Sequence, residues 1–202
     1  MSYAVLTGDI VASSALTASA LNATLNTLRA AATEIGNWPP SPATAFARRG
    51  GDGWQVTLDR PALALRAALY LQARLLRADD TASTRIAIAT GDGTIPPNGD
   101  LNAAHGPAFT ASGRALDDIP THATMIHAAG GALAAATYLA DHIAAGWTQA
   151  QARALCEMLP PGAGPRAAAA ERLGISRQAV DQALRAAGYP ALDAALGALE
   201  CM

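Results

Sequence analysis

Two aspartates stand where this chain could bind a cation. Asp9 follows an apolar run at residues 3–7, and Asp52 lies in the glycine-rich stretch 50–53. Carboxylate oxygens suit Mg²⁺, which keeps several waters and completes its shell with the phosphates of a substrate. The neighbouring glycines leave room for a phosphate chain to approach backbone N–H groups. An alternative interpretation is that both aspartates only cap turns, a common role of this residue type.

The elements that would position these aspartates alternate between strands and helices. Apolar runs at residues 3–7, 44–48, 54–58 and 85–90 predict four strands, and leucine spacing predicts helices at about 16–35 and after Pro61. The order is that of the split βαβ, or ferredoxin-like, fold, so the predicted class is α+β. Strands one and three are then antiparallel neighbours, which would bring Asp9 and Asp52 to one edge of the sheet.

The second half of the chain is predicted to be mostly helical. A loop at 94–107 precedes a short helix at 109–116, a fifth strand at 122–128 and a helix at 131–145. Thr148 is a natural N-cap for a helix that runs to Met158. The proline- and glycine-rich stretch 160–165 is the clearest linker. We therefore predict an α/β domain at 1–147 and a helical segment at 148–202.

Residues 165–188 predict a helix-turn-helix. Gly174 permits the turn, Ser176 caps the second helix, and Ile175, Val180 and Leu184 are expected to point inward. The exposed side chains expected to contact DNA are Ser176, Arg177, Gln178, Asp181, Gln182 and Arg185. Arginine and glutamine can make paired hydrogen bonds with guanine and adenine edges. The alternative is a helical hairpin that packs on the main domain or binds protein.

Several short motifs resemble those of class III nucleotidyl cyclases. They are GDIVASS at 8–14, GDG at 51–53, RIAIATG at 85–91, and GPAF at 106–109 followed by Arg114. The GPAF and GDI forms are similar to the SatD family, which shares the cyclase-like pattern. The resemblance covers about residues 3–118.

The resemblance implies roles for particular residues. Asp9 and Asp52 would hold Mg²⁺ or Mn²⁺, and Arg114 would stabilise charge that develops on a phosphate. Nucleotide contacts would come from Gly8, Ile10, Arg48, Gly51 and Gly53, and Thr110 stands where a catalytic asparagine is expected. Arg48 also replaces a base-reading lysine, and 102–104 (NAA) lacks a base-reading aspartate. Cyclase sites form between two subunits, so the resemblance implies a homodimer.

Composition narrows the possible settings of the protein. The net charge of −2 gives no overall attraction to nucleic acid, so DNA contact would need a local patch. The two cysteines, far apart in sequence, fit no metal spacing and suggest a reducing compartment. No apolar stretch approaches the length of a membrane span, and the first residues do not resemble a signal peptide. We therefore expect a cytoplasmic protein with no membrane partner. The glycine-rich stretch 50–53 between the second and third strands predicts a hairpin turn. Trp54, directly after this hairpin turn, is the aromatic residue to test for ligand contact.

Two functions from different classes follow. The first is a DNA-binding transcriptional regulator whose degenerate cyclase-like domain dimerises and binds nucleotide and a divalent metal. The second is an active nucleotidyl cyclase, or a related nucleotide-processing enzyme, with an accessory helical tail. A scaffold that binds neither ligand is the third alternative.

Overall fold

A five-stranded mixed sheet forms the centre of the molecule in the computed structural model, which describes residues 1–201. The strands are β1 (Ser2–Ile10), β2 (Thr44–Arg49), β3 (Gly53–Leu58), β4 (Thr84–Asp92) and β5 (Met125–His127), in the spatial order β2-β3-β1-β4-β5. β1 is antiparallel to β3 and β4, whereas β5 joins β4 in parallel. The first four strands have the ferredoxin-like order, which confirms the predicted α+β class.

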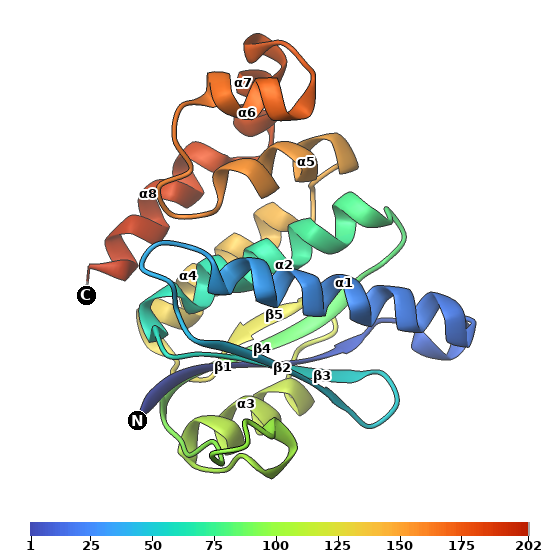
Figure 1. Cartoon of the computed structure of the whole chain (residues 1–202), viewed down its shortest axis with the longest axis vertical. Coiled ribbons are helices and arrows are strands. Elements are labelled where there is room, and N and C mark those ends of the chain that lie inside the picture. The colour runs from blue at the N-terminus through green and yellow to red at the C-terminus, as the bar shows by residue number, and fades with distance from the viewer. Residues whose placement is uncertain (202) are drawn as a thin grey trace.

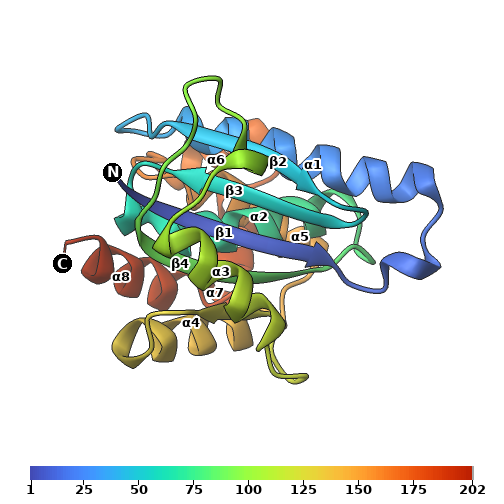
Figure 2. The same ribbon diagram turned by 90° about the horizontal axis from the view of Figure 1, so that it is seen from below.

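Helices cover both faces of the sheet (Figures 1 and 2). One face carries α1 (Ala18–Gly36), α2 (Ala64–Ala78) and α4 (Gly131–Ala144), and the other carries α3 (Pro107–Asp117). Short 3₁₀ helices lie at η1 (Ser13–Ala15), η2 (Pro61–Leu63) and η3 (Leu101–Ala103). Alternation along each strand explains the layers. In β1, Ala4 and Leu6 enter the core beneath α1 and α2, whereas Val5 packs with Phe109 of α3.

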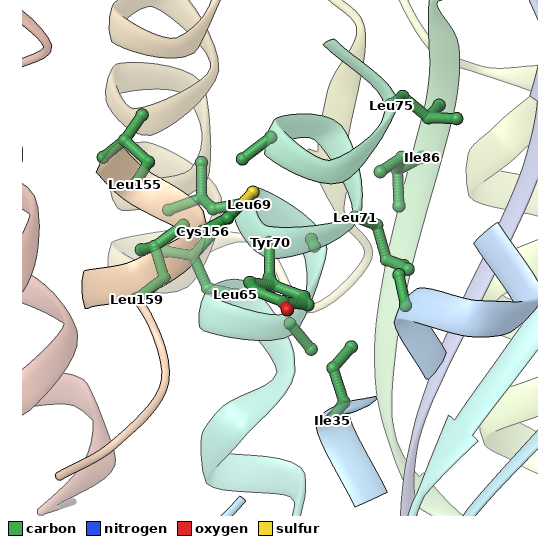
Figure 3. Packing of buried hydrophobic residues seen from close by; sticks show 14 of the residues in the cluster. Ile35, Leu65, Leu69, Tyr70, Leu71, Leu75, Ile86, Leu155, Cys156 and Leu159 are labelled. Atoms are coloured by element: carbon green, nitrogen blue, oxygen red, sulfur yellow. The ribbon is translucent and has the colours of Figure 1, made fainter. Parts of the chain in front are cut away.

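Four further helices stack on the outer side of α2 (Figure 1). They are α5 (Gln149–Met158), α6 (Arg166–Leu173), α7 (Arg177–Ala186) and α8 (Tyr189–Glu200). Thr148 caps α5 through a capping box with Gln151, as the sequence predicted. Figure 3 shows Leu155, Cys156 and Leu159 packed beside Leu65 and Leu69 of α2. One apolar core therefore continues from the sheet into the C-terminal helices.

Arg66 of α2 joins the two halves of the chain by polar contacts. Its side chain is 6 % exposed and forms ion pairs with Glu200 at 2.5 Å and Asp193 at 3.2 Å, both on α8. It also donates to the carbonyl oxygen of Leu159 at 3.0 Å. A buried guanidinium needs such partners because its transfer out of water is costly when it stays unpaired.

Two details of the structure differ from the sequence prediction. β1 extends to Ile10, so Asp9 lies inside the strand, because its backbone pairs on both sides, with Gly53 and with Arg85. The predicted loop at 94–107 contains η3 and a β-bridge between Thr94 and His105.

Among residues 1–201, every helix is too short or too polar to cross a bilayer.

Candidate functional site

Asp9 and Asp52 lie at the same edge of the sheet. The register between β1 and β3 places Asp9 opposite Gly53, the residue that follows Asp52. The Asp9 side chain is 22 % exposed, and Asp52 accepts a hydrogen bond from the hydroxyl of Ser13. We call this edge, formed by Asp9, Ser13, Asp52 and Arg85, the acidic rim.

Arg85 supplies the cation of the acidic rim, and the sequence analysis gave it no role. It stands opposite Asp9 in the register between β1 and β4, donating from Nε to Oδ1 at 2.9 Å and from its terminal nitrogen to Oδ2. The hydrogen bonds to Asp9 raise the pKa of Arg85, against a smaller opposing effect of burial, and the charges of Asp117 and Asp52 add to the rise. The pair depends on the register between β1 and β4, and Asp9 lies outside the predicted strand 3–7, so the sequence pattern carried no signal for it.

The acidic rim as it stands does not fit a divalent metal. Both oxygens of Asp9 are bonded to Arg85, and Asp52 is bonded to Ser13. No group of three or more metal-ligating side chains occurs within residues 1–201. A metal ion at Asp9 would have to displace the guanidinium of Arg85.

The residues beside the aspartates have structural roles. A Cβ at Gly8 would overlap the Trp54 ring and the carbonyl of Arg85, so this glycine lets β1 pass close to both. The side chain of Ile10 is 3 % exposed in the core, which leaves only its backbone near the rim. A Cβ at Gly53 would overlap the carbonyl of Arg49.

Arg48 holds the turn between β2 and β3. Its Nε donates to the carbonyl of Gly51 at 2.7 Å, and a terminal nitrogen donates to Asn22 of α1 at 2.9 Å. The side chain is therefore engaged between the turn and α1.

Thr110 and Arg114 lie on the exposed side of α3, one turn apart. The opposite side of α3 is buried and holds Ser112, whose hydroxyl lies 2.8 Å from that of Thr7 on β1. Within residues 1–201, neither Thr110 nor Arg114 makes a hydrogen bond or ion pair with Asp9 or Asp52. Within residues 1–201 of one copy, these four residues are thus not joined by direct polar contacts.

Trp54, the aromatic residue named above for a test of ligand contact, has no surface open to a ligand. Trp54 is 0 % exposed, and its indole N–H donates to Thr84 at 2.8 Å inside the core. Neighbouring residues of a strand point to opposite faces of the sheet. Trp54 therefore points to the face that α1 and α2 cover, whereas Gln55 points to the face that α3 covers and donates to the hydroxyl of Thr7.

A second candidate surface lies on α6 and α7. Gly174 ends α6 in the left-handed conformation at φ 65°, and Ser176 accepts from the backbone N–H of Ala179 at 3.1 Å. Val180 and Leu184 are fully buried, as predicted, and anchor α7 on α5 and α6. Ile175 is 46 % exposed, so the prediction that it points inward is wrong; its position in the turn faces solvent.

One side of α7 presents polar side chains to solvent: Ser176 at its cap, then Arg177, Gln178, Gln182 and Arg185 are exposed. Asp181 in their midst is only 23 % exposed and accepts from Arg166 of α6 at 2.7 Å. The hydrogen bond from Arg166 lowers the pKa of Asp181. The sequence pattern predicted an exposed side chain here, whereas in the structure Asp181 is half-buried and paired with Arg166. We call the four exposed residues Arg177, Gln178, Gln182 and Arg185 the α7 surface.

Comparison with known proteins gives a likeness of fold to nucleotidyl cyclases. No protein-family model matches the chain. No curated protein matches it either. Among solved structures, it is similar to the guanylyl cyclase Cya2, with 16% identity and a TM-score of 0.48 over 65% of this chain and 79% of that one. It is also similar to the adenylyl cyclase CyaB from P. aeruginosa, with 17% identity and a TM-score of 0.47 over 62% and 76%.

A bacterial light-regulated adenylyl cyclase gives 16% identity and a TM-score of 0.45, over 62% and 74% of the two chains. These values concern the fold alone.

Proposed function

We propose that this protein is a DNA-binding regulator that contacts DNA through the α7 surface. The observation that carries the proposal is the sorting of side chains on α7. Val180 and Leu184 are fully buried, whereas two arginines and two glutamines share the exposed side. A helix held in this way after a short capped turn is suited to enter the major groove, where its arginines and glutamines meet base edges.

The local charge supports the same proposal. Residues 166–188 contain Arg166, Arg172, Arg177 and Arg185 against Glu171 and Asp181, although the whole chain is acidic. Asp181 pairs with Arg166 at 2.7 Å and lies 3.8 Å from Arg177, so it offsets part of this charge, and the segment keeps a net charge of +2 from four arginines against two acidic residues. Two copies of the chain would double this positive patch, so we propose that the protein binds DNA as a homodimer.

A mobility-shift assay on duplexes from the region upstream of the protein's own gene tests the proposal. We expect the protein to shift a duplex at low salt. The affinity for this duplex should fall about fivefold or more in Gln178→Ala and in Gln182→Ala, because a well-placed base contact contributes roughly 1–3 kcal/mol. Arg60→Ala, at an exposed position at the start of η2, is the control and should bind normally. No shift of any fragment at low salt would overturn the proposal.

The second candidate is binding or processing of a nucleotide, with Mg²⁺ or Mn²⁺, at the acidic rim. Its support is the shared position of Asp9 and Asp52 and the nearby guanidinium of Arg85, which suits a phosphate oxygen. A phosphate that attracted Arg85 would release the oxygens of Asp9. We propose that Arg114 meets such a ligand from a second copy of the chain, as the homodimer predicted from the sequence would allow.

Incubation with each nucleoside triphosphate and Mg²⁺ or Mn²⁺, followed by chromatography, tests this second candidate. Turnover that Asp9→Ala abolishes would establish an enzyme. The absence of both turnover and thermal stabilisation with all of the triphosphates would exclude the rim as a nucleotide site.

A further inference from the structure

A cavity of about 370 Å³ opens on the face of the sheet that carries α1, α2 and α4. None of its lining residues belongs to the α7 surface. It lies between the C-terminal part of α2, the loop 79–83 that leads into β4, and the corner where α4 meets α5. Its volume falls within the range of pockets that hold small organic molecules.

The walls of the cavity divide into an apolar and a polar part. Leu75, Leu76 and Trp147 supply the apolar part, and Gln72, Asp80 and Ser83 stand among the polar groups. Such a division favours a ligand with an apolar body and a polar head, because each part finds a matching wall.

Hydrogen bonds within the protein determine which polar groups remain for a ligand. The hydroxyl of Thr124 already donates to Asp141 and accepts from the amide nitrogen of Gln72 at 3.2 Å, which leaves the side-chain oxygen of Gln72 as an acceptor. The exposed carboxylate of Asp80 forms no ion pair within residues 1–201, and no basic side chain lines the cavity there. The lining therefore offers one negative charge, no positive charge, and neutral polar groups.

We propose that this cavity binds a small organic ammonium ion with an aromatic or aliphatic body. The ammonium group would donate to Asp80, while the body packs against Leu75, Leu76 and Trp147. An anionic ligand such as a free phosphate would be repelled by the like charge of Asp80 and would find no cation among the lining residues.

The cavity is joined to α7 by a direct contact. The indole N–H of Trp147 donates to the carbonyl of Ala187, the residue that ends α7, at 2.9 Å. A ligand that packs on Trp147 would therefore contact the side chain whose hydrogen bond holds the C-terminal end of α7. On this basis the ammonium ion is an effector of DNA binding; this second part, unlike the binding itself, rests on the proposed function.

The test uses the full chain and 2-phenylethylamine as the probe, with 3-phenylpropionate as the anion of similar size. Calorimetric titration should show saturable binding of the amine and at least about tenfold weaker binding of the anion, the ratio expected for one charge-assisted hydrogen bond. Asp80→Asn should weaken amine binding about tenfold, and Ala145→Leu, which narrows the mouth, should also reduce it. Asp118→Asn, an equal change of charge at an exposed site on the far side of the sheet, should leave it unchanged.

Each result separates the two proposals. Equal binding of amine and anion, no saturation, or unchanged affinity in both cavity variants would overturn the ammonium site. DNA binding that the amine leaves unaltered would overturn the effector role alone. A chain that binds the amine but no DNA would overturn the proposed function and leave the ammonium site standing.

Discussion

Individual side chains at the acidic rim already balance one another's charge. Asp9 would be unfavourable beside Asp52 without a cation, and Arg85 provides it from the neighbouring strand. Asp9 is thus neutralised inside the chain, whereas Asp52 is held only by the hydroxyl of Ser13. A ligand at this rim must compete with an ion pair that is partly exposed and therefore weakly held.

Removal of the Arg85 charge should uncover the metal-binding capacity of the rim. In Arg85→Gln the carboxylates of Asp9 and Asp52 lose their counter-ion, so Mn²⁺ should raise the melting temperature of the variant more than that of the parent. Thermal unfolding at increasing Mn²⁺ measures this difference, with Arg60→Gln as the control for charge. Equal responses in all three proteins would contradict this account of Arg85.

The two cysteines should differ sharply in reactivity. Burial raises the pKa of the Cys156 thiol to about 12, and its side chain lies in the core, whereas Cys201 is exposed. Because the thiolate is the reacting form, iodoacetamide should label one thiol in the native protein at pH 8 and two after unfolding in urea. Mass spectrometry of the labelled peptides identifies the site, and rapid native labelling of Cys156 would contradict its burial.

At the level of elements, the turn before α7 has to be rigid for the α7 surface to keep its orientation. Ser176→Ala removes the acceptor for the N–H of Ala179 and should lower the free energy of unfolding by about 1 kcal/mol. Urea unfolding measures the change. Ser19→Ala, at an exposed position in the first turn of α1, should have a smaller effect, and an equal loss in both variants would contradict a capping role.

The sequence predicted most elements because their signals are local. The glycine-rich hairpin, the cap at Thr148 and the helical spacing of the leucines each depend on neighbours along the chain, and each appears where it was expected. The role of Arg85 was not predicted because its pairing with Asp9 depends on the register between β1 and β4. Trp54 was misjudged because its position beside the hairpin does not reveal which face of the sheet it occupies.

At the scale of the whole molecule, the C-terminal helices share a core with the sheet domain. Leu155 and Leu159 of α5 pack on α2, and Arg66 bonds α8. The proline- and glycine-rich stretch at 160–165 marks a chain reversal between packed helices, and the core continues on both sides of it. Sequence composition could locate that stretch but not the long-range pairs that close the structure around it.

Loss of Arg66 should weaken the whole molecule. Arg66→Met leaves Glu200 and Asp193 without their cation, and because water screens these carboxylates, which are 19 % and 47 % exposed, the loss should be about 1–3 kcal/mol. Since the core is continuous, calorimetry should show one unfolding transition that moves to lower temperature. Arg60→Met is the control, and two separate transitions in the parent chain would contradict a shared core.

The most direct measurement is the salt dependence of DNA binding by the full chain, followed by fluorescence anisotropy on a labelled duplex. If the α7 surface contacts phosphates and bases, the logarithm of the binding constant should fall linearly with the logarithm of salt concentration. The double variant Arg177→Ala, Arg185→Ala should bind more weakly and reduce the slope by about 2, whereas Arg60→Ala should not change it. No binding at low salt, or the same slope in the double variant as in the parent, would contradict the account.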